Sequence, residues 1–351
     1  MILVTGGLGF IGSHTVRALV DLGEGCVLVQ RRAGGPPAGL DGARVAVERA
    51  DITDLPALLD IGSRHTITGI VHLAGSVPWP PGADRPVDGA RKAIDSLLNV
   101  IAAAEAWGVP RVGVASTIGV YGGVAAEGAL REDMPLPMIA GHIIPAFKKV
   151  GELLTDHLAD ATGIEIINYR ISAVWGPLGR PASPFFAAPQ LVHAAVRGAA
   201  PALGPLSPPV HAAVRGAAPD PGPLGLPVDA AVRGPAPDLG PLRPPVHAED
   251  AIDLCYVKDC ARAIALLQLA GRLHHRTYNV ASGRATTNAE VIAAIRRVVP
   301  DARIDLPTGG TGQYTCLDIT RIRQDTGYRP VYDAERAAAD YIGWLRAGNE
   351  R

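Results

Sequence analysis

The stretch MILVTGGLGFIGSHTVRALVDLGEGCVLVQRR, residues 1–32, decides the fold of this chain. The apolar residues at 2–4 predict a short buried strand, and the apolar positions between 11 and 20 predict one face of a helix. A glycine-rich turn joins these segments, and the apolar residues 27–29 predict a second strand after the helix. Strand, helix and strand in this order form a βαβ unit, which indicates the start of a parallel sheet.

The turn of this unit carries Gly6, Gly9 and Gly12 in the spacing G-x-x-G-x-x-G. One glycine permits the tight turn, another lets a pyrophosphate approach the backbone, and the third lets the helix pack closely against the strand. The N-terminus of the helix then offers free N–H groups and a positive dipole end to the phosphates. Because the glycines lie between a strand and a helix, the sequence predicts a dinucleotide-binding turn.

The composition is that of a folded protein. The chain has 351 residues, 48% of them hydrophobic and 19% charged, with a formal net charge of −1, and this length suffices for one large or two modest domains. The sequence has no basic block, so nucleic acid is not expected as a partner, and no apolar run is long enough to cross a membrane. The four cysteines lack C-x-x-C spacing, which predicts reduced thiols in a cytoplasmic protein and no metal site.

Strand-like and helix-like segments alternate through the rest of the first half of the chain. They predict an α/β fold with a Rossmann-type doubly wound parallel sheet, whose binding crevice should lie at the carboxyl ends of the strands. We expect further strands at 45–47, 70–73, 111–115 and 164–169, and helices ending near 61 and spanning 89–106 and 147–161.

A segment of the second half is repetitive, with HAAVRG or DAAVRG recurring every 18 residues before a Pro/Gly-rich tail. Each unit has only about six residues free of proline, too few to drive stacking into a solenoid. We therefore interpret about 193–246 as a tandem duplication within one loop, whose first copy ends a helix that starts near 184. The copies occupy 193–198, 211–216 and 229–234. The histidines that recur through this copying, and are therefore not interpreted as metal ligands, are His193, His211 and His247.

Residues 5–14, TGGLGFIGSH, resemble the TGGxGFIGSH signature of the extended short-chain dehydrogenase/reductases, the NAD-dependent epimerase/dehydratase family. The resemblance implies an NAD(P)-binding Rossmann domain over 1–170 and a mainly substrate-binding smaller C-terminal lobe over 171–351. Further segments similar to motifs of this family are HLAG at 72–75, ASTIGVYG at 115–122, KKVGE at 148–152, DLCYVKD at 253–259 and YNVASG at 278–283.

The resemblance also implies which residues hold the cofactor. The family has an Asp at the end of the second strand for the adenosine ribose, where this chain has Gln30 followed by Arg31 and Arg32. A neutral amide and two guanidinium groups suit a 2′-phosphate better than a bare ribose diol, so NADP is favoured over NAD. The implied cofactor residues are Gly6, Gly9, Phe10, Ile11, Gly12, Gln30, Arg31, Arg32, Asp51, Ile52, Leu73, Ala74, Gly75 and Lys148.

The catalytic residues of the family are matched only in part. By the resemblance, Thr117 holds the reacting oxygen of the substrate and Lys148 holds the nicotinamide ribose. The family places a catalytic tyrosine four residues before this lysine, and here that position is Ile144. Losing a general acid or base typically costs about 10²–10⁴ in rate. His142 is the nearest alternative, since an imidazole has a suitable pKa.

The sequence indicates the substrate less clearly than the cofactor. Relatives acting on nucleotide sugars often hold the diphosphate with two arginines, whose positions here are Ile252 and the loop 308–311. Without these cations diphosphate binding should be weaker, since charge-assisted hydrogen bonds are the strong ones.

These patterns lead to one main function and two alternatives. The main hypothesis is an enzyme, an oxidoreductase or epimerase acting on a small hydroxy or keto metabolite such as a sugar or natural-product intermediate. One alternative is an NAD(P)-binding protein without hydride chemistry, which is a regulator, a scaffold or a non-redox lyase or isomerase. The other alternative is a nucleotide-sugar 4-epimerase. The resemblance further implies a homodimer that pairs through the helices at 89–106 and 147–161.

Overall fold

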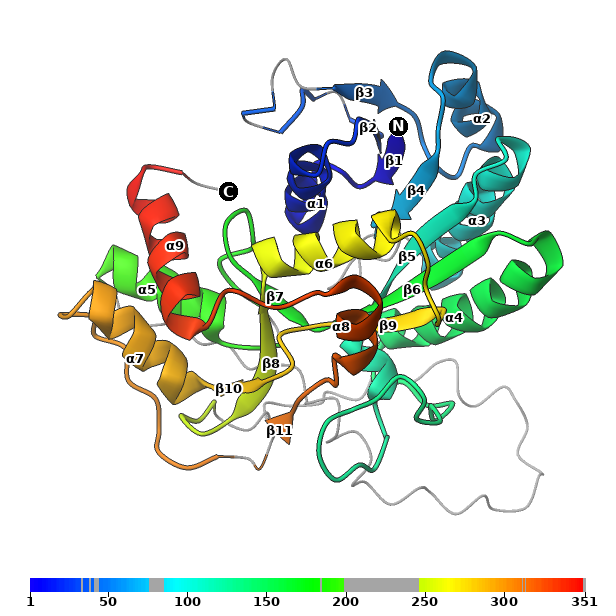
Figure 1. Cartoon of the computed structure of the whole chain (residues 1–351). Helices are drawn as coiled ribbons and strands as arrows, with labels where there is room; N and C mark the ends of the chain where they lie inside the picture. The colour runs from blue at the N-terminus through cyan, green and yellow to red at the C-terminus, as the bar shows by residue number, and fades with distance from the viewer. Residues whose placement is uncertain are drawn as a thin grey trace, which may run out of the picture.

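The N-terminal βαβ unit of the computed structural model matches the sequence pattern (Figure 1). It consists of β1 (Ile2–Thr5), α1 (Phe10–Asp21) and β2 (Cys26–Gln30), and β1 and β2 pair in parallel. Leu3 packs on one face of the sheet, whereas Ile2 and Val4 pack on the other, as the two-residue period of a strand requires. The structure describes residues 1–32, 34–37, 39–40, 44–75, 85–183, 185–198, 246–310, 312 and 314–349.

The main sheet has seven parallel strands among these residues, in the order β3-β2-β1-β4-β5-β6-β9. The order reverses beside β1, which lies between β2 and β4, and such a reversal opens a crevice at the carboxyl ends of the strands. The predicted doubly wound parallel sheet is thus confirmed. Its remaining strands are β3 (Val45–Arg49), β4 (Gly69–His72), β5 (Arg111–Thr117), β6 (Glu165–Ile171) and β9 (Thr277–Val280).

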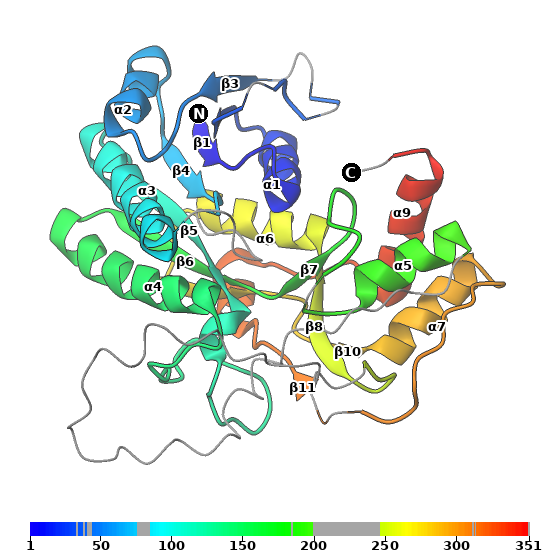
Figure 2. The ribbon, with the colours of Figure 1, turned by 180° about the vertical axis from the view of Figure 1, so that it is seen from behind.

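Helices cover both faces of this sheet. One face carries α2 (Leu55–Arg64), α3 (Pro86–Ala106) and α4 (Ile143–Thr162), which run side by side in Figure 2. The other face carries α1 and α6 (Val257–Leu269). Two of the helices start earlier than expected, α3 at 86 and α4 at 143, because proline is tolerated in the first turn of a helix, where its missing N–H has no partner to bond.

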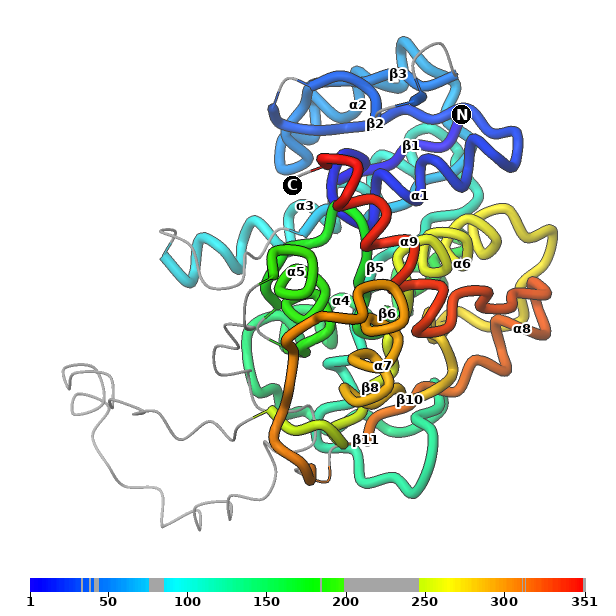
Figure 3. The backbone as a smooth tube through the Cα atoms, turned by 90° about the vertical axis from the view of Figure 1, so that its left-hand side faces the viewer, coloured from blue at the N-terminus to red at the C-terminus, as the bar shows by residue number. Residues whose placement is uncertain are grey.

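A smaller mixed sheet forms around β8 (Ala251–Tyr256) in the second half of the chain. The antiparallel β10 (Ala285–Thr287) pairs on one side of β8 and the parallel β11 (Tyr314–Thr315) on the other, while the parallel β7 (Ala173–Trp175) pairs with the C-terminal half of β8. Three helices bury an apolar core against this sheet and lie together in Figure 3. They are α5 (Ala188–Arg197), α7 (Asn288–Val298) and α9 (Ala334–Arg346), while α8 (Thr320–Thr326) packs near α6 and β9.

The first repeat copy ends a helix, as expected, because α5 finishes at Arg197 before the left-handed Gly198. The helix starts at 188 rather than near 184. The second and third copies, together with His211, lie outside the described residues. His193 bonds the Tyr341 hydroxyl at 2.9 Å, and the described part of the chain contains no cluster of three or more His, Cys, Asp or Glu suited to a metal ion. No helix in the described ranges is both long and apolar enough to cross a membrane.

Candidate functional site

The glycine-rich turn is built by close backbone contacts. Gly6 has φ of +70°, and its carbonyl accepts a hydrogen bond from the Gly9 N–H at 2.8 Å. A Cβ on Gly12 would lie 2.1 Å from the Gly6 oxygen, so only glycine fits there. Among the described residues no side chain caps α1, so its first N–H groups stay open to an anion. The turn therefore fits the pyrophosphate of a dinucleotide.

The end of β4 lies against this turn. A Cβ on Gly6 would come within 3.1 Å of the Ala74 backbone. The Ala74 N–H donates to the Thr5 hydroxyl at 3.2 Å, and the same hydroxyl is hydrogen-bonded to His72 Nδ1 at 2.8 Å. Burial, with a smaller contribution from the charge of Lys148, lowers the pKa of His72 to about 3. His72 is therefore neutral and joins β1 to β4, beside Leu73, Ala74 and Gly75.

At the end of β2, Gln30 is half-buried and its amide nitrogen has no hydrogen-bond partner in the described part of the chain. An orphaned donor at this place fits an adenosine ribose or its phosphate. Arg31 and Arg32 follow and are exposed.

Asp51 and Ile52 lie at the carboxyl end of the neighbouring strand, β3. Burial alone would raise the pKa of Asp51, but the Thr53 N–H and hydroxyl, at 3.0 and 2.8 Å, hold it below its usual value with help from Arg31 and Lys92. The Ile52 carbonyl accepts a hydrogen bond from Asn99 on α3 at 3.0 Å.

A cavity of about 210 Å³ lies between the ends of β4 and β5 and the helices α3 and α4. Its wall includes Lys148 together with Ala74, Gly75, Ser116 and Ile144. Lys148 Nζ donates to the Ala115 carbonyl at 2.6 Å. Burial lowers the pKa of Lys148 to about 8, although the Glu152 carboxylate partly opposes this. The Lys148 ammonium group thus lies at the carboxyl end of β5, in the wall of this cavity.

The neighbouring Lys149 has a different role. It donates to the carbonyls of Pro137 and of Ile139, the latter at 2.6 Å, and so fixes the loop before α4. Of these two adjacent lysines, only Lys148 lines the cavity.

Thr117 and His142 are both described, and neither lines this cavity. Thr117 ends β5, and its hydroxyl accepts the Gly119 N–H at 3.2 Å to begin the short 3₁₀ helix η1 (Ile118–Tyr121). His142 precedes α4 and stacks on Phe185 with ring centroids 5.5 Å apart. Burial lowers the pKa of His142. The structure therefore places Lys148 beside the ends of β4 and β5, in the wall of the cavity. Thr117 follows the lining residue Ser116, and His142 lies outside the cavity at the start of α4.

A buried ion pair supports α4 beneath the cavity. Both carboxylate oxygens of Glu152 accept hydrogen bonds from the Arg170 guanidinium, at 2.7 to 3.1 Å. The Ser116 hydroxyl donates to the same carboxylate. Arg170 also donates to the Tyr121 hydroxyl at 3.0 Å, and burial raises the pKa of Tyr121 to about 12. These contacts join α4 to β5, β6 and η1.

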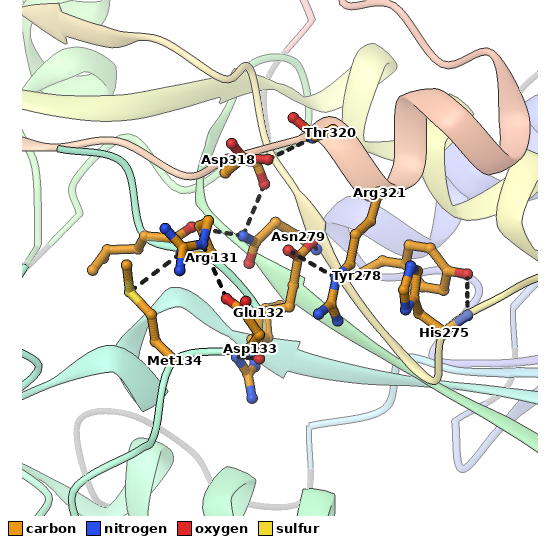
Figure 4. A network of polar contacts seen from close by, with 12 residues as sticks. Arg131, Glu132, Asp133, Met134, His275, Tyr278, Asn279, Asp318, Thr320 and Arg321 are labelled. Carbon is orange, nitrogen blue, oxygen red and sulfur yellow. Dashed lines mark hydrogen bonds and ion pairs between the residues drawn. The ribbon is translucent and has the colours of Figure 1, made fainter.

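The network continues into the second half of the chain (Figure 4). The Tyr121 hydroxyl donates to Asn279 Oδ1 at 2.8 Å, and the Asn279 N–H donates to Glu132 at 2.8 Å. Arg321 lies 3.7 Å from the Glu132 carboxylate, and Asn279 also donates to the Asp318 carbonyl at 2.9 Å. Sequence reasoning missed this network, although Glu152 stands in the KKVGE segment at 148–152 that resembles a motif of the family.

Comparisons with known proteins agree with this fold and turn. The model of the NAD dependent epimerase/dehydratase family matches residues 2–207. UDP-glucose 4-epimerase of Azospirillum brasilense is 32% identical over 182 residues, which cover 51% of each chain. UDP-glucuronate 4-epimerase 1 of Arabidopsis thaliana is 29% identical over 197 residues, or 53% of this chain and 45% of that one. The chain thus spans about half the length of these curated relatives.

Solved structures resemble the chain over its whole length. UDP-glucose 4-epimerase of Thermotoga maritima, crystallised with UDP-glucose, aligns with a TM-score of 0.73 at 21% identity over 99% of both chains. dTDP-glucose 4,6-dehydratase of Bacillus anthracis, in complex with NAD, aligns with a TM-score of 0.72 at 18% identity over 99% of this chain and 96% of that one. These similarities show the shared fold, and the family match covers the glycine turn and Lys148. The chain therefore belongs to the NAD-dependent epimerase/dehydratase family, an enzyme family.

Proposed function

We propose that this chain binds a nicotinamide dinucleotide and interconverts epimers of a nucleotide sugar, as a 4-epimerase does. The cavity that places Lys148 beside Ala74 and Gly75 carries this proposal, because it lies at the end of β5 and Ala74 in its wall is close to Gly6 of the glycine turn. The similarity to UDP-glucose 4-epimerases supports the choice of substrate class. When bound, the dinucleotide would accept a hydride from the sugar carbon and return it. Residues 1–170 would mainly bind the dinucleotide, and 171–351 would mainly bind the substrate.

Different residues of the chain would bind the separate parts of the dinucleotide and the reacting oxygen of the substrate. The N-terminus of α1 would hold the pyrophosphate, Gln30 and its neighbours the adenosine ribose, and Lys148 the nicotinamide ribose. Thr117, at the end of β5, would hydrogen-bond the reacting oxygen. Ile144 lies one turn before Lys148, where the family's tyrosine is expected, and its side chain can neither give nor take a proton.

A second candidate function, hydride transfer to a small hydroxy or keto metabolite, is favoured by Ile252. This side chain is partly buried against the core of the smaller sheet, at the position where a diphosphate-binding arginine is expected. The Thr308, Gly309 and Gly310 positions of the second expected arginine loop also lack a cation. A substrate without a diphosphate would need neither arginine.

One experiment separates these functions. The purified protein is denatured and any released nucleotide identified by mass, and the protein is then incubated with UDP-glucose or UDP-galactose in the presence of NAD or NADP. We expect the two sugar nucleotides to interconvert, as measured by chromatography. If a dinucleotide binds but neither sugar nucleotide reacts, the small-metabolite alternative is favoured. If neither dinucleotide binds at millimolar concentration, both hydride-transfer functions are wrong.

We further propose that NADP binds more tightly than NAD. Gln30→Asp should reverse this preference, because a carboxylate accepts a hydrogen bond from a ribose hydroxyl but repels a 2′-phosphate. Replacing attraction by repulsion at this contact is expected to change the ratio of the two Kd values by about 10–100-fold. Fluorescence titration measures both constants. The matched control is Gln324→Asp on the exposed face of α8, which should leave the ratio unchanged.

We also propose a homodimer that pairs through α3 and α4. Their outer faces expose four large apolar side chains, Val87, Leu98, Val150 and Leu153, and Leu153 is 68% exposed. Leu153→Glu would place a charge in this apolar contact, so we expect the dimer Kd to rise about 100-fold. Sedimentation velocity measures the change, with Leu22→Glu at the end of α1 as the control. A wild-type protein that stays monomeric at 100 µM, roughly a hundred times a typical dimer Kd of about 1 µM, would contradict the dimer.

A further inference from the structure

Among the described residues, the wall of the cavity contains three titratable side chains, and two of them are hydrogen-bonded to other side chains. His72, from β4, is neutral and bonded to Thr5. Glu152, from α4, is held by Arg170 and by Ser116. Lys148 is the third, and within the described part of the chain its Nζ makes one hydrogen bond, to the Ala115 carbonyl at 2.6 Å. An ammonium group has three N–H bonds, so this leaves two for a ligand in the cavity.

The other surroundings of Lys148 are mainly apolar. α3 faces the cavity with Ala93, Ile94 and Leu97, and α4 adds Ile144 and Phe147. Such a wall disfavours the charged form of an amine, and the pKa of Lys148 falls to about 8. Both the ammonium and the neutral amine are then accessible near neutral pH, which is the condition for an efficient general acid and base.

We propose that Lys148 is itself the acid and base of the reaction, in place of the tyrosine whose position Ile144 occupies. This inference rests on the proposed function, since it assumes a dinucleotide bound at the glycine turn. During oxidation the substrate O–H bond breaks and an N–H bond forms on the neutral Lys148 amine. The O–H electron pair becomes the second bond of a carbonyl, while the C–H electron pair leaves as hydride to the nicotinamide. In the return step the carbon is reduced and the Lys148 ammonium gives its proton back to the oxygen.

The other candidate groups fit this role less well. His142 stacks on Phe185 and does not line the cavity. The Thr117 hydroxyl positions an oxygen but is too weak an acid to exchange a proton near neutral pH. Lys149 is occupied by the carbonyls of Pro137 and Ile139.

The first test uses the fact that the chain has only four lysines, Lys92, Lys148, Lys149 and Lys258. The ligand-free protein is labelled with ¹³C-lysine, and the four Cε signals are followed by NMR from pH 6 to 11. The signal absent from Lys148→Arg should titrate with a midpoint near pH 8. A midpoint above about pH 10, the value of an ordinary lysine, would overturn the proposal without any reference to activity.

The second test separates holding the dinucleotide from moving the proton. A guanidinium donates hydrogen bonds but does not release its proton below about pH 12. Lys148→Arg should therefore keep the dinucleotide Kd within about threefold of wild type, while kcat falls by about 10²–10⁴. Ile144→Tyr in the Lys148→Arg background should recover part of the lost rate, because it supplies a phenol. Lys258→Arg, which keeps the ion pair with Asp340 away from the cavity, is the control.

The pH dependence completes the test. Because the neutral amine is the base, kcat/KM for oxidation should rise tenfold per pH unit below about pH 8 and level off above it. A wild-type protein that binds no dinucleotide would refute the proposed function and this inference together. If the wild type turns over but Lys148→Arg keeps more than a third of its rate, only the inference on Lys148 is wrong.

Discussion

Gly12→Ala is expected to abolish measurable dinucleotide binding and to lower the free energy of unfolding by about 1–3 kcal/mol, the usual range for overpacking. The new Cβ would lie 2.1 Å from the Gly6 oxygen, 2.8 Å from the Gly6 carbonyl carbon and 2.9 Å from the Gly7 Cα. All three are backbone atoms, so no side chain can rotate away. The Gly6 turn cannot retreat easily either, because the Ala74 backbone lies so close that a Cβ on Gly6 would come within 3.1 Å of it.

Relief of this clash would move the start of α1 away from β1, and the N–H groups that should face the pyrophosphate would move with it. Binding is measured by fluorescence titration with NADP and NAD, and stability by urea unfolding. Gly89→Ala on α3 is the matched control, since a Cβ there meets nothing within 4 Å. Alanine in a helix is favoured over glycine by about 0.5–1 kcal/mol, so this control should be slightly more stable and bind normally. Normal binding by Gly12→Ala would show that the turn is not the dinucleotide site.

The first βαβ unit was predictable because each of its determinants is local. The apolar residues of β1 and α1 lie within about twenty residues of one another, and the glycine spacing refers only to the turn between them. For the main sheet, the sequence predicted the class, a doubly wound parallel sheet, but not the order of its strands. Its last strand, β9, pairs with β6 across more than a hundred residues, for example Asn168 with Thr277, and no local pattern reports such a pairing.

In the candidate site, too, the features with local determinants were predictable and those that depend on the whole fold were not. The positions of Lys148 and Ile144 could be predicted because both belong to one local motif on α4. The cavity around Lys148 is formed by β4, β5, α3 and α4 together, so its size and its apolar wall could not be predicted from any one segment. The occupation of Lys149 by the loop at Pro137 and Ile139 likewise depends on three-dimensional packing.

Glu152→Ala is expected to destabilise the protein by about 3–5 kcal/mol, which is the usual cost of breaking a buried ion pair. Glu152 and Arg170 are 9% and 5% exposed, so the substitution would leave a guanidinium charge in the interior. Ser116 would lose its acceptor as well. Urea unfolding of the ligand-free protein measures the loss.

Arg276→Ala is the matched control, because Arg276 also ties α4 to the end of the main sheet, through Asp156 and Asp160. This arginine is 42% exposed, and exposed pairs contribute at most about 1 kcal/mol. If both variants lose the same stability, the contact between α4 and the sheet matters and the burial of the charge does not. The double variant Glu152→Leu/Arg170→Met should be more stable than Glu152→Ala, since it removes both charges and keeps the volume.

Glu152→Ala also tests whether the buried ion pair affects the pKa of Lys148. The Glu152 carboxylate raises the pKa of Lys148 against the effect of burial. In Glu152→Ala the Lys148 Cε signal should therefore titrate at a lower pH than in wild type, because the ammonium form has lost a nearby negative charge that stabilises it. Arg276→Ala should leave that midpoint in place. An unchanged midpoint in Glu152→Ala would mean that Arg170 already neutralises the carboxylate and that the ion pair holds α4 without acting on Lys148.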